Sequence, residues 1–187
     1  MNRQITARAA SYQDILDAPP TMVAEIIRGA LHLQPRPVPR HARASSALGM
    51  ELGSPFDRGR GGPGGWWILD EPELHLGADV LVPDVAGWRR ERMPKLPDAA
   101  WFELAPDWVC EVLSPSTRRL DLTDKRDIYG ACGVGHLWLV DPDERTLEAF
   151  ERRDGAWVLI AAIAGEAEVR IAPFDAVAFP LEALWTD

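Results

Sequence analysis

Cysteine is scarce in this sequence, and the histidines form no recognisable site. Only two cysteines, Cys110 and Cys132, are present, and they form no Cys-X-X-Cys motif. Both lie in segments that look buried, so we interpret them as free thiols that act as small hydrophobic side chains in a reducing cytoplasm. The four histidines are scattered without the spacing of zinc ligands, which excludes a zinc-finger type of protein.

Long apolar runs are also missing. No stretch of about 18 apolar residues occurs, so neither a membrane-spanning helix nor membrane contact is expected. The N-terminal segment lacks the apolar stretch of a secretory signal, and we therefore expect a cytoplasmic protein. The 187 residues, 47% of them hydrophobic, contain no internal repeat and no interdomain linker, so residues 1–187 are expected to form one domain.

Positive charge is in deficit, which argues against simple electrostatic binding of nucleic acid. The net charge is −9, but residues 141–187 carry 11 acidic against 4 basic side chains, and residues 1–140 carry 18 against 16. Basic residues gather in four groups: Arg36, Arg40 and Arg43; Arg58 and Arg60; Arg89, Arg90, Arg92 and Lys95; Arg118 and Arg119. A nucleic-acid surface and a generic solvated acidic surface both remain open.

The order of the elements favours an α/β fold. The pattern predicts short helices at 11–17 and 181–185, longer helices at 40–52 and 121–132, a glycine-rich loop at 56–65, and strands at 22–27, 31–33, 66–69, 80–88, 108–113, 136–140, 147–150 and 157–162. Strand, helix and strand follow one another between residues 108 and 140, which predicts a right-handed crossover between two parallel strands. We expect a mixed central β-sheet flanked by helices.

Two acidic residues interrupt otherwise apolar strands. Glu111 lies within the apolar run from Trp108 to Leu113, and Asp84 lies within the run from Val80 to Trp88. A buried carboxylate loses hydration worth several kcal/mol unless a cation or hydrogen bonds compensate. The pair therefore suggests an oxygen-ligand site for a hard divalent cation, with the carboxylates about 4–6 Å apart. The alternative, strand-end residues that face water, stays open.

A predicted helix after Glu111 carries a lysine. Four residues fall at spacings of three, four and three and so share one helical face: Leu122, Lys125, Tyr129 and Cys132. Lys125 would then point from the packed face toward the preceding strand and the two carboxylates. It is the only lysine after Lys95. The alternative is a surface lysine paired with Asp121 at i,i+4.

Several motifs together resemble a known family. They are Ala24–Gly29, Pro37–His41, Pro83–Asp84, Glu111–Thr117, the set Asp121, Lys125 and Tyr129, and Gly133–Pro142. With these motifs, most of the chain is similar to the Uma-type restriction endonucleases of the PD-(D/E)XK nuclease superfamily. The usual superfamily signature has a lysine two residues after the strand glutamate, where this chain has Leu113. The resemblance implies that the role of that lysine has moved to Lys125.

The resemblance implies a metal-dependent endonuclease that hydrolyses phosphodiester bonds in DNA. Asp84, Glu111 and the backbone carbonyl of Val112 would hold Mg²⁺ or Mn²⁺, and Lys125 would be catalytic. Glu25 would add a further catalytic carboxylate, or it is a strand residue that faces solvent. His41 would contact phosphate, or it is simply a residue at the start of a helix.

Other roles are left open by the same residues. Tyr129 and the tryptophans are interpreted mainly as core residues. The chain could instead be an inactive module on a nuclease fold that binds nucleic acid or a protein partner. DNA is the expected partner, and self-association into a homodimer is left open.

Overall fold

A mixed six-stranded sheet forms the centre of the computed structural model, which describes residues 8–185. Its strand order is β10-β9-β8-β7-β6-β3. The strands are β3 (Trp66–Asp70), β6 (Val85–Arg89), β7 (Trp108–Val112), β8 (His136–Asp141), β9 (Thr146–Arg153) and β10 (Ala156–Ala164). β7 and β8 run parallel, and the other neighbouring pairs run antiparallel. The predicted α/β fold with a mixed sheet is therefore confirmed.

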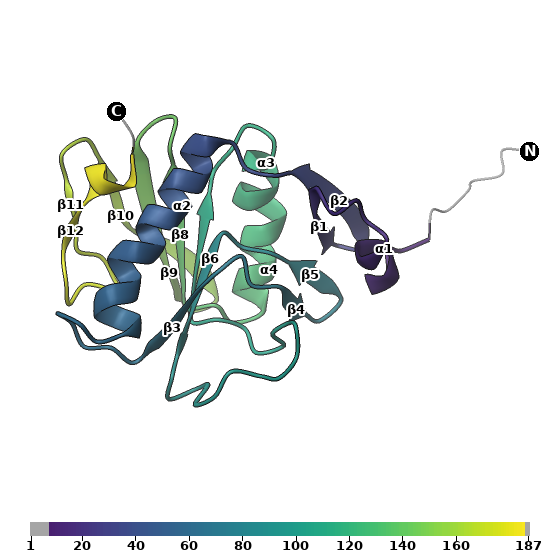
Figure 1. The fold of residues 1–187 in the computed structure, drawn as a ribbon, viewed down its shortest axis with the longest axis horizontal. Helices are drawn as coiled ribbons and strands as arrows, with labels where there is room; N and C mark the ends of the chain where they lie inside the picture. The colour runs from purple at the N-terminus through teal and green to yellow at the C-terminus, as the bar shows by residue number, and fades with distance from the viewer. Residues whose placement is uncertain (1–7, 186–187) are drawn as a thin grey trace, which may run out of the picture.

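Helices cover both faces of this sheet (Figure 1). α2 (Pro39–Leu52) lies on one face, where its apolar stripe packs with Trp108 and Trp138. On the other face, one helical stretch consists of α3 (Arg118–Leu120), a π-helical turn (Asp121–Lys125) and α4 (Arg126–Ala131). β7 is buried on both faces because its side chains alternate: Trp108, Cys110 and Val112 face α2, whereas Val109 and Glu111 face α4.

A second sheet, β2-β1-β5-β4, lies beside the first and carries the N-terminal hairpin. Its strands are β1 (Met22–Ile27), β2 (Ala30–Pro35), β4 (Leu74–Leu76) and β5 (Asp79–Leu81), and α1 (Tyr12–Leu16) precedes it. Arg28 and Gly29 form the hairpin turn with φ of 51° and 76°, as a two-residue type I′ turn requires. Ile26 pairs with Val80, which attaches the hairpin to the rest of the protein.

The C-terminal part completes the α2 side of the core. β9 and β10 form the predicted hairpin, with Asp154 and Gly155 at its turn, and β11 (Glu168–Val169) pairs with β12 (Phe179–Pro180). A 3-10 helix, Leu181–Leu184, follows as expected, and its buried leucines join the cluster under α2. No helix within residues 8–185 is long and apolar enough to cross a bilayer.

Four details of the sequence prediction are wrong. Asp84 is not inside a strand: it lies between β5 and β6, because Pro83 lacks the N–H that a continuous ladder needs. The second long helix begins at Arg118, so Asp121 lies one turn inside it. Cys132 is exposed because it follows the last residue of α4, whereas Cys110 is buried as expected. Phe56 belongs to a π-helical turn after α2 and is buried, so the glycine-rich loop begins later.

Candidate active site

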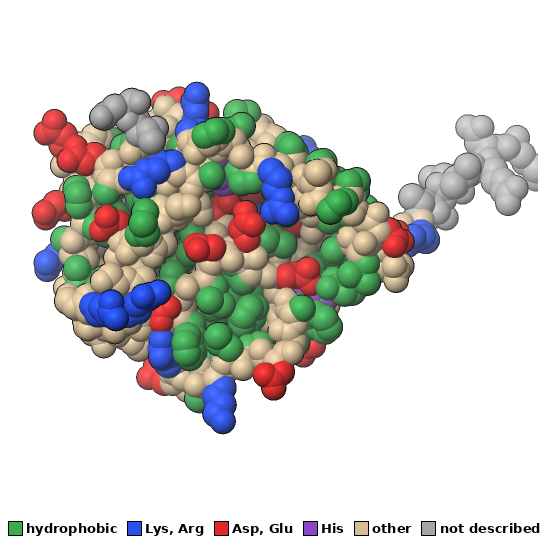
Figure 2. All heavy atoms as spheres, in the orientation of Figure 1, with side chains coloured by type: hydrophobic (Ala, Val, Ile, Leu, Met, Phe, Trp, Pro, Cys, Tyr) green, Lys and Arg blue, Asp and Glu red, His purple; other side chains and the backbone are tan. Residues whose placement is uncertain are grey.

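A cavity of about 220 Å³ opens at the end of the central sheet where β7 ends and β6 begins. Its walls come from the β1–β2 hairpin, the start of α2 and the segment between β7 and α3. The charged and histidine side chains that line it are Glu25, Arg36, His41, Glu71, Asp84, Glu111, Asp121 and Lys125. Figure 2 shows acidic side chains in a hollow on this side of the molecule, with basic side chains nearby. The structure thus brings every side chain proposed from the sequence to one cavity.

Strand pairing places Asp84 beside Glu111. β6 pairs with β7 so that Val85 is opposite Cys110, and one step further along this register Asp84 is opposite Glu111. Residues directly opposite each other in an antiparallel pair project from the same face of the sheet. The backbone N–H of Val112 donates a hydrogen bond of 2.7 Å to Asp84 Oδ2, which fixes this carboxylate at the end of β7.

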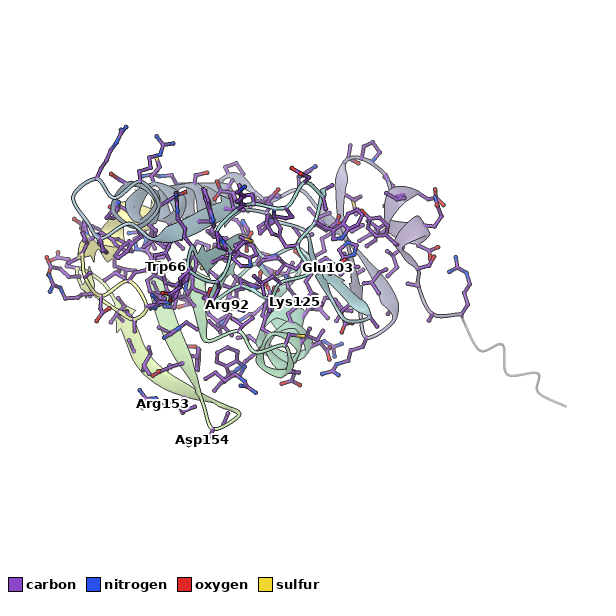
Figure 3. The ribbon with its side chains drawn as sticks, turned by 90° about the horizontal axis from the view of Figure 1, so that it is seen from below. Trp66, Arg92, Glu103, Lys125, Arg153 and Asp154 are labelled. Carbon is purple, nitrogen blue, oxygen red and sulfur yellow. The ribbon has the colours of Figure 1, made fainter. Side chains whose placement is uncertain are left out.

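Lys125 is enclosed by three carboxylates. Its Nζ lies 2.8 Å from Glu111 Oε1, 3.1 Å from Glu25 Oε1 and 3.5 Å from Asp121 Oδ1. In Figure 3, Lys125 lies in the interior, whereas Arg153 and Asp154 lie at the far tip of the β9–β10 hairpin. The Lys125 side chain is only 4% exposed, so the alternative of a surface lysine is wrong, although the i,i+4 pair with Asp121 does form.

Lys125 and Asp121 both face inward from a π-helical turn. A π turn contains an extra residue relative to an α-helical turn and changes which residues share a face, and such turns are frequent at functional sites. Asp121 and Lys125 are the first and last residues of this turn, and both are buried. Tyr129 follows one α-helical turn later; Lys125 and Tyr129 contact Glu111, and Asp121 contacts Lys125.

Glu25 reaches the site from a different sheet. It is 1% exposed, so the alternative of a residue that faces solvent is wrong. Glu25 Oε1 also accepts a hydrogen bond of 2.8 Å from the backbone N–H of Val82, and Gln34 Nε2 donates to Oε2 at 2.9 Å. These bonds hold the carboxylate against Lys125 and link the hairpin to the segment just before Asp84.

Burial shifts the protonation equilibria of this cluster. Loss of hydration raises the pKa of Glu111 well above its ordinary value of 4.5, and the positive charge of Lys125 opposes this only in part. Burial lowers the pKa of Lys125, but the charges of Glu111 and Glu25 outweigh it, and the pKa rises well above 10.5. Lys125 therefore keeps its proton. Its single positive charge is shared by three carboxylates, so the cluster favours binding of additional positive charge.

His41 contacts Asp84 from the first turn of α2. Its Nε2 lies 3.3 Å from Asp84 Oδ1, and its side chain is 9% exposed. Burial lowers the pKa of His41, but the hydrogen bond and charge of Asp84 outweigh it, and the net effect is a raised pKa. Asp84 is thus held by His41 through one oxygen and by Val112 through the other.

Tyr129 and Asp121 are the site residues that sequence reasoning missed. Tyr129 is fully buried, as a core residue would be, yet its hydroxyl donates a hydrogen bond of 2.5 Å to Glu111 Oε1. Asp121 was named among the motifs that resemble the family and as the possible partner of a surface lysine, but it was given no role in the site. The available signal was the shared helical face of Asp121, Lys125 and Tyr129, with spacings of four and four.

Replacing Tyr129 with phenylalanine should lower the free energy of unfolding by about 1–3 kcal/mol, because a buried carboxyl group loses a donor. Urea denaturation measures this change. Tyr12→Phe is the matched control: it is the only other tyrosine, and its hydroxyl donates to the partly exposed Glu73. We expect a loss below about 1 kcal/mol for this variant. Equal losses in the two variants would show that the Tyr129 hydroxyl has no special role.

The donor set at the end of β7 fits a small divalent cation. Carboxylate and carbonyl oxygens are hard ligands, and Mg²⁺ typically binds through one or two carboxylates, several waters and substrate phosphates. Within residues 8–185, no group of three or more His, Cys, Asp or Glu side chains is placed so that it could hold a metal ion by itself. Lys125 and Tyr129 both contact Oε1 of Glu111, so Oε2 is the oxygen directed away from these two donors.

The central sheet with its flanking helices defines a restriction-endonuclease-like fold. The chain belongs to the Uma2 family, described as "Putative restriction endonuclease", whose model matches residues 9–182. A similar solved structure is that of "a putative nuclease belonging to DUF820 from Anabaena variabilis ATCC 29413", with a TM-score of 0.75 and 23% identity. The match covers 94% of this chain and 97% of that chain, which shows a shared fold. A search of curated proteins gave no significant match.

Proposed function

We propose that this protein is a metal-dependent endonuclease that hydrolyses phosphodiester bonds in DNA. The observation that carries the proposal is the buried Lys125 ammonium, 2.8 Å from Glu111 Oε1, in a cavity that Asp84 also lines. Membership of the Uma2 family supports the same reaction class. A lysine beside two carboxylates at the end of a strand supplies both a cation site and a positive charge for the transition state.

Each residue receives a role from its contacts. Asp84, Glu111 and the Val112 carbonyl would hold Mg²⁺ or Mn²⁺. A cation bound there would polarise the phosphate and lower the pKa of the attacking water. Lys125 would orient that water or stabilise the charge that develops on the phosphate. Glu25 and Asp121 would position the Lys125 ammonium.

His41 is better suited to position Asp84 than to contact phosphate directly. Its Nε2 is already directed at Asp84 Oδ1, and the residue is only 7% exposed. The phosphate contact suggested by the family resemblance would require the ring to leave Asp84. We therefore propose that His41 keeps the Asp84 carboxylate aligned with the cation site.

Incubation of the purified chain with supercoiled plasmid DNA tests the proposed function. We expect nicked and linear products with Mn²⁺ or Mg²⁺ and none with EDTA, because the carboxylates need a cation to act on a phosphate. Gel electrophoresis and the time course of product formation measure the reaction. Binding of DNA with Mn²⁺ but without any product would instead support an inactive binding module, and absence of both would contradict the proposal.

A further inference from the structure

Several strands of the central sheet end or begin in one row at the cavity. β8 ends at Asp141, β7 ends at Val112, β6 begins at Val85 and β3 ends at Asp70. The pairs Val112–Val140, Val85–Cys110 and Asp70–Val85 show that these ends lie side by side. Asp84 and Glu111 occupy the middle of this row, next to the β6 and β7 ends.

Exposed arginines lie at both ends of the row, two at the β8 end and one at the β3 end. On the β8 side, Arg118 contacts Asp141 and Arg40 contacts Asp143, in the turn directly after β8. On the β3 side, Arg36 lies 3.6 Å from Glu71, the residue directly after β3. Each of these arginine side chains is more than half exposed: 51% for Arg118, 64% for Arg40 and 59% for Arg36.

These ion pairs orient the arginines but leave other N–H donors of each guanidinium group able to bind a phosphate. A guanidinium group has five N–H donors, and an exposed ion pair contributes only about 0–1 kcal/mol, so a phosphate can be added at low cost. Asp141 is itself nearly buried and accepts hydrogen bonds from the backbone N–H groups of Asp143 and Glu144. The turn that holds Arg118 is therefore fixed in place.

The length of the row matches a short piece of one DNA strand. Four neighbouring strands span roughly 14 Å, because strands in a sheet are about 4.8 Å apart. A strand of B-DNA carries one phosphate for about 3.4 Å of helix axis, so this length corresponds to about four nucleotides. A phosphate over the carboxylates in the middle would place the phosphates about two nucleotides away on either side near the two ends, because each end lies about 7 Å from the middle.

We infer that Arg36 on one side and Arg40 with Arg118 on the other bind the DNA phosphates that flank the scissile one. The inference rests on the proposed function, because it takes the cavity as the place of cleavage. It assigns the path of the bound strand, which crosses the strand ends between the β3 side and the β8 side, without fixing its 5′-to-3′ direction. It also explains how a chain with a net charge of −9 can bind a polyanion through a few oriented arginines.

The salt dependence of DNA binding tests this inference. Binding of the full chain to a fluorescently labelled 20-base-pair duplex is measured in EDTA at several salt concentrations, so that cleavage does not interfere. The variants are Arg36→Gln, Arg40→Gln and Arg118→Gln. Each should reduce the slope of log affinity against log salt by about 0.9, the value for one lost phosphate contact. An increase in salt from 50 to 200 mM weakens DNA binding by a certain factor, and this factor should therefore be about threefold smaller for each variant than for the parent.

Arg153→Gln is the matched control. Arg153 is 57% exposed and paired with Glu151, so the substitution removes the same charge from a similar surface ion pair at the far hairpin. We expect its slope to equal that of the parent. Equal slopes for the parent and the three site variants, or an equal reduction in Arg153→Gln, would overturn the inference but leave the proposed function intact. A parent chain that does not bind the duplex in EDTA would overturn the inference but not the proposed function, which the plasmid assay with Mn²⁺ tests separately. Binding as expected without metal-dependent cleavage would contradict only the proposed catalysis.

Discussion

Lys125→Met is expected to lower the rate of DNA cleavage at saturating Mn²⁺ by about 100- to 1,000-fold, the usual effect of losing one electrostatic donor at a transition state. The variant should also be less stable. Lys125 is the cation shared by Glu25, Glu111 and Asp121, and all four side chains are buried. Removing one partner of a buried ion pair costs about 3–5 kcal/mol. Cleavage rates and urea denaturation measure the two effects separately.

The chain offers a matched control for this substitution. Lys95 is the only other lysine, and it is exposed in the connection between β6 and β7. Lys95→Met should therefore keep both the cleavage rate and the free energy of unfolding of the parent. If Lys125→Met remained folded and cleaved DNA as fast as Lys95→Met, Lys125 would be a structural residue and the proposed mechanism would be wrong.

A second substitution separates stability from catalysis at Lys125. In Lys125→Met/Glu111→Gln, one of the three carboxylates that depend on the ammonium is also neutralised. This double variant should recover part of the stability lost in Lys125→Met, because fewer buried charges lack a partner. Its cleavage activity should not recover, since both groups are assigned to the reaction.

The sequence was sufficient to predict the strand and helix that carry Glu111 and Lys125. The apolar run around Glu111 indicated a strand buried on both faces, and the structure places β7 in the middle of the central sheet. The helical spacing correctly indicated that Lys125 faces inward. These features depend on local periodicity, which a single sequence displays directly.

The contacts of Glu25 could not be predicted in this way. They depend on how the hairpin is attached to the other strands, through the Ile26–Val80 pair and the bond from Val82 to Glu25. These residues are more than fifty positions apart in the sequence, and no periodic pattern records their pairing. The π-helical turn at Asp121–Lys125 was also missed, because π turns are rare and occur mostly as single turns inside α-helices, so no sequence period marks them.

Loss of either proposed cation ligand should abolish activity. Asp84→Ala and Glu111→Gln are expected to reduce Mn²⁺-dependent cleavage to the background level, because each removes one of the two carboxylates at the junction of β6 and β7. Plasmid cleavage over a range of Mn²⁺ concentrations measures the loss. Asp70→Asn provides a control, because Asp70 ends β3 in the same row but lies outside the cavity lining. Full activity in both ligand variants would contradict the assigned site.

Glu111→Gln should at the same time make the cation-free protein more stable at neutral pH. The folded-state pKa of Glu111 is raised above 4.5. Below about pH 4.5, Glu111 is therefore protonated in both the folded and the unfolded chain, and its ionisation does not reduce the free energy of unfolding. As the pH rises through the folded-state pKa, the parent loses this stability, whereas the glutamine variant does not. The difference in unfolding free energy between the variant and the parent should therefore increase from pH 4 to pH 8, as measured by urea denaturation in EDTA. A difference that stays constant or decreases over this range would show that the folded protein does not raise the pKa of Glu111. Glu111 would then not lie in the buried, negatively charged environment on which its proposed role in cation binding depends.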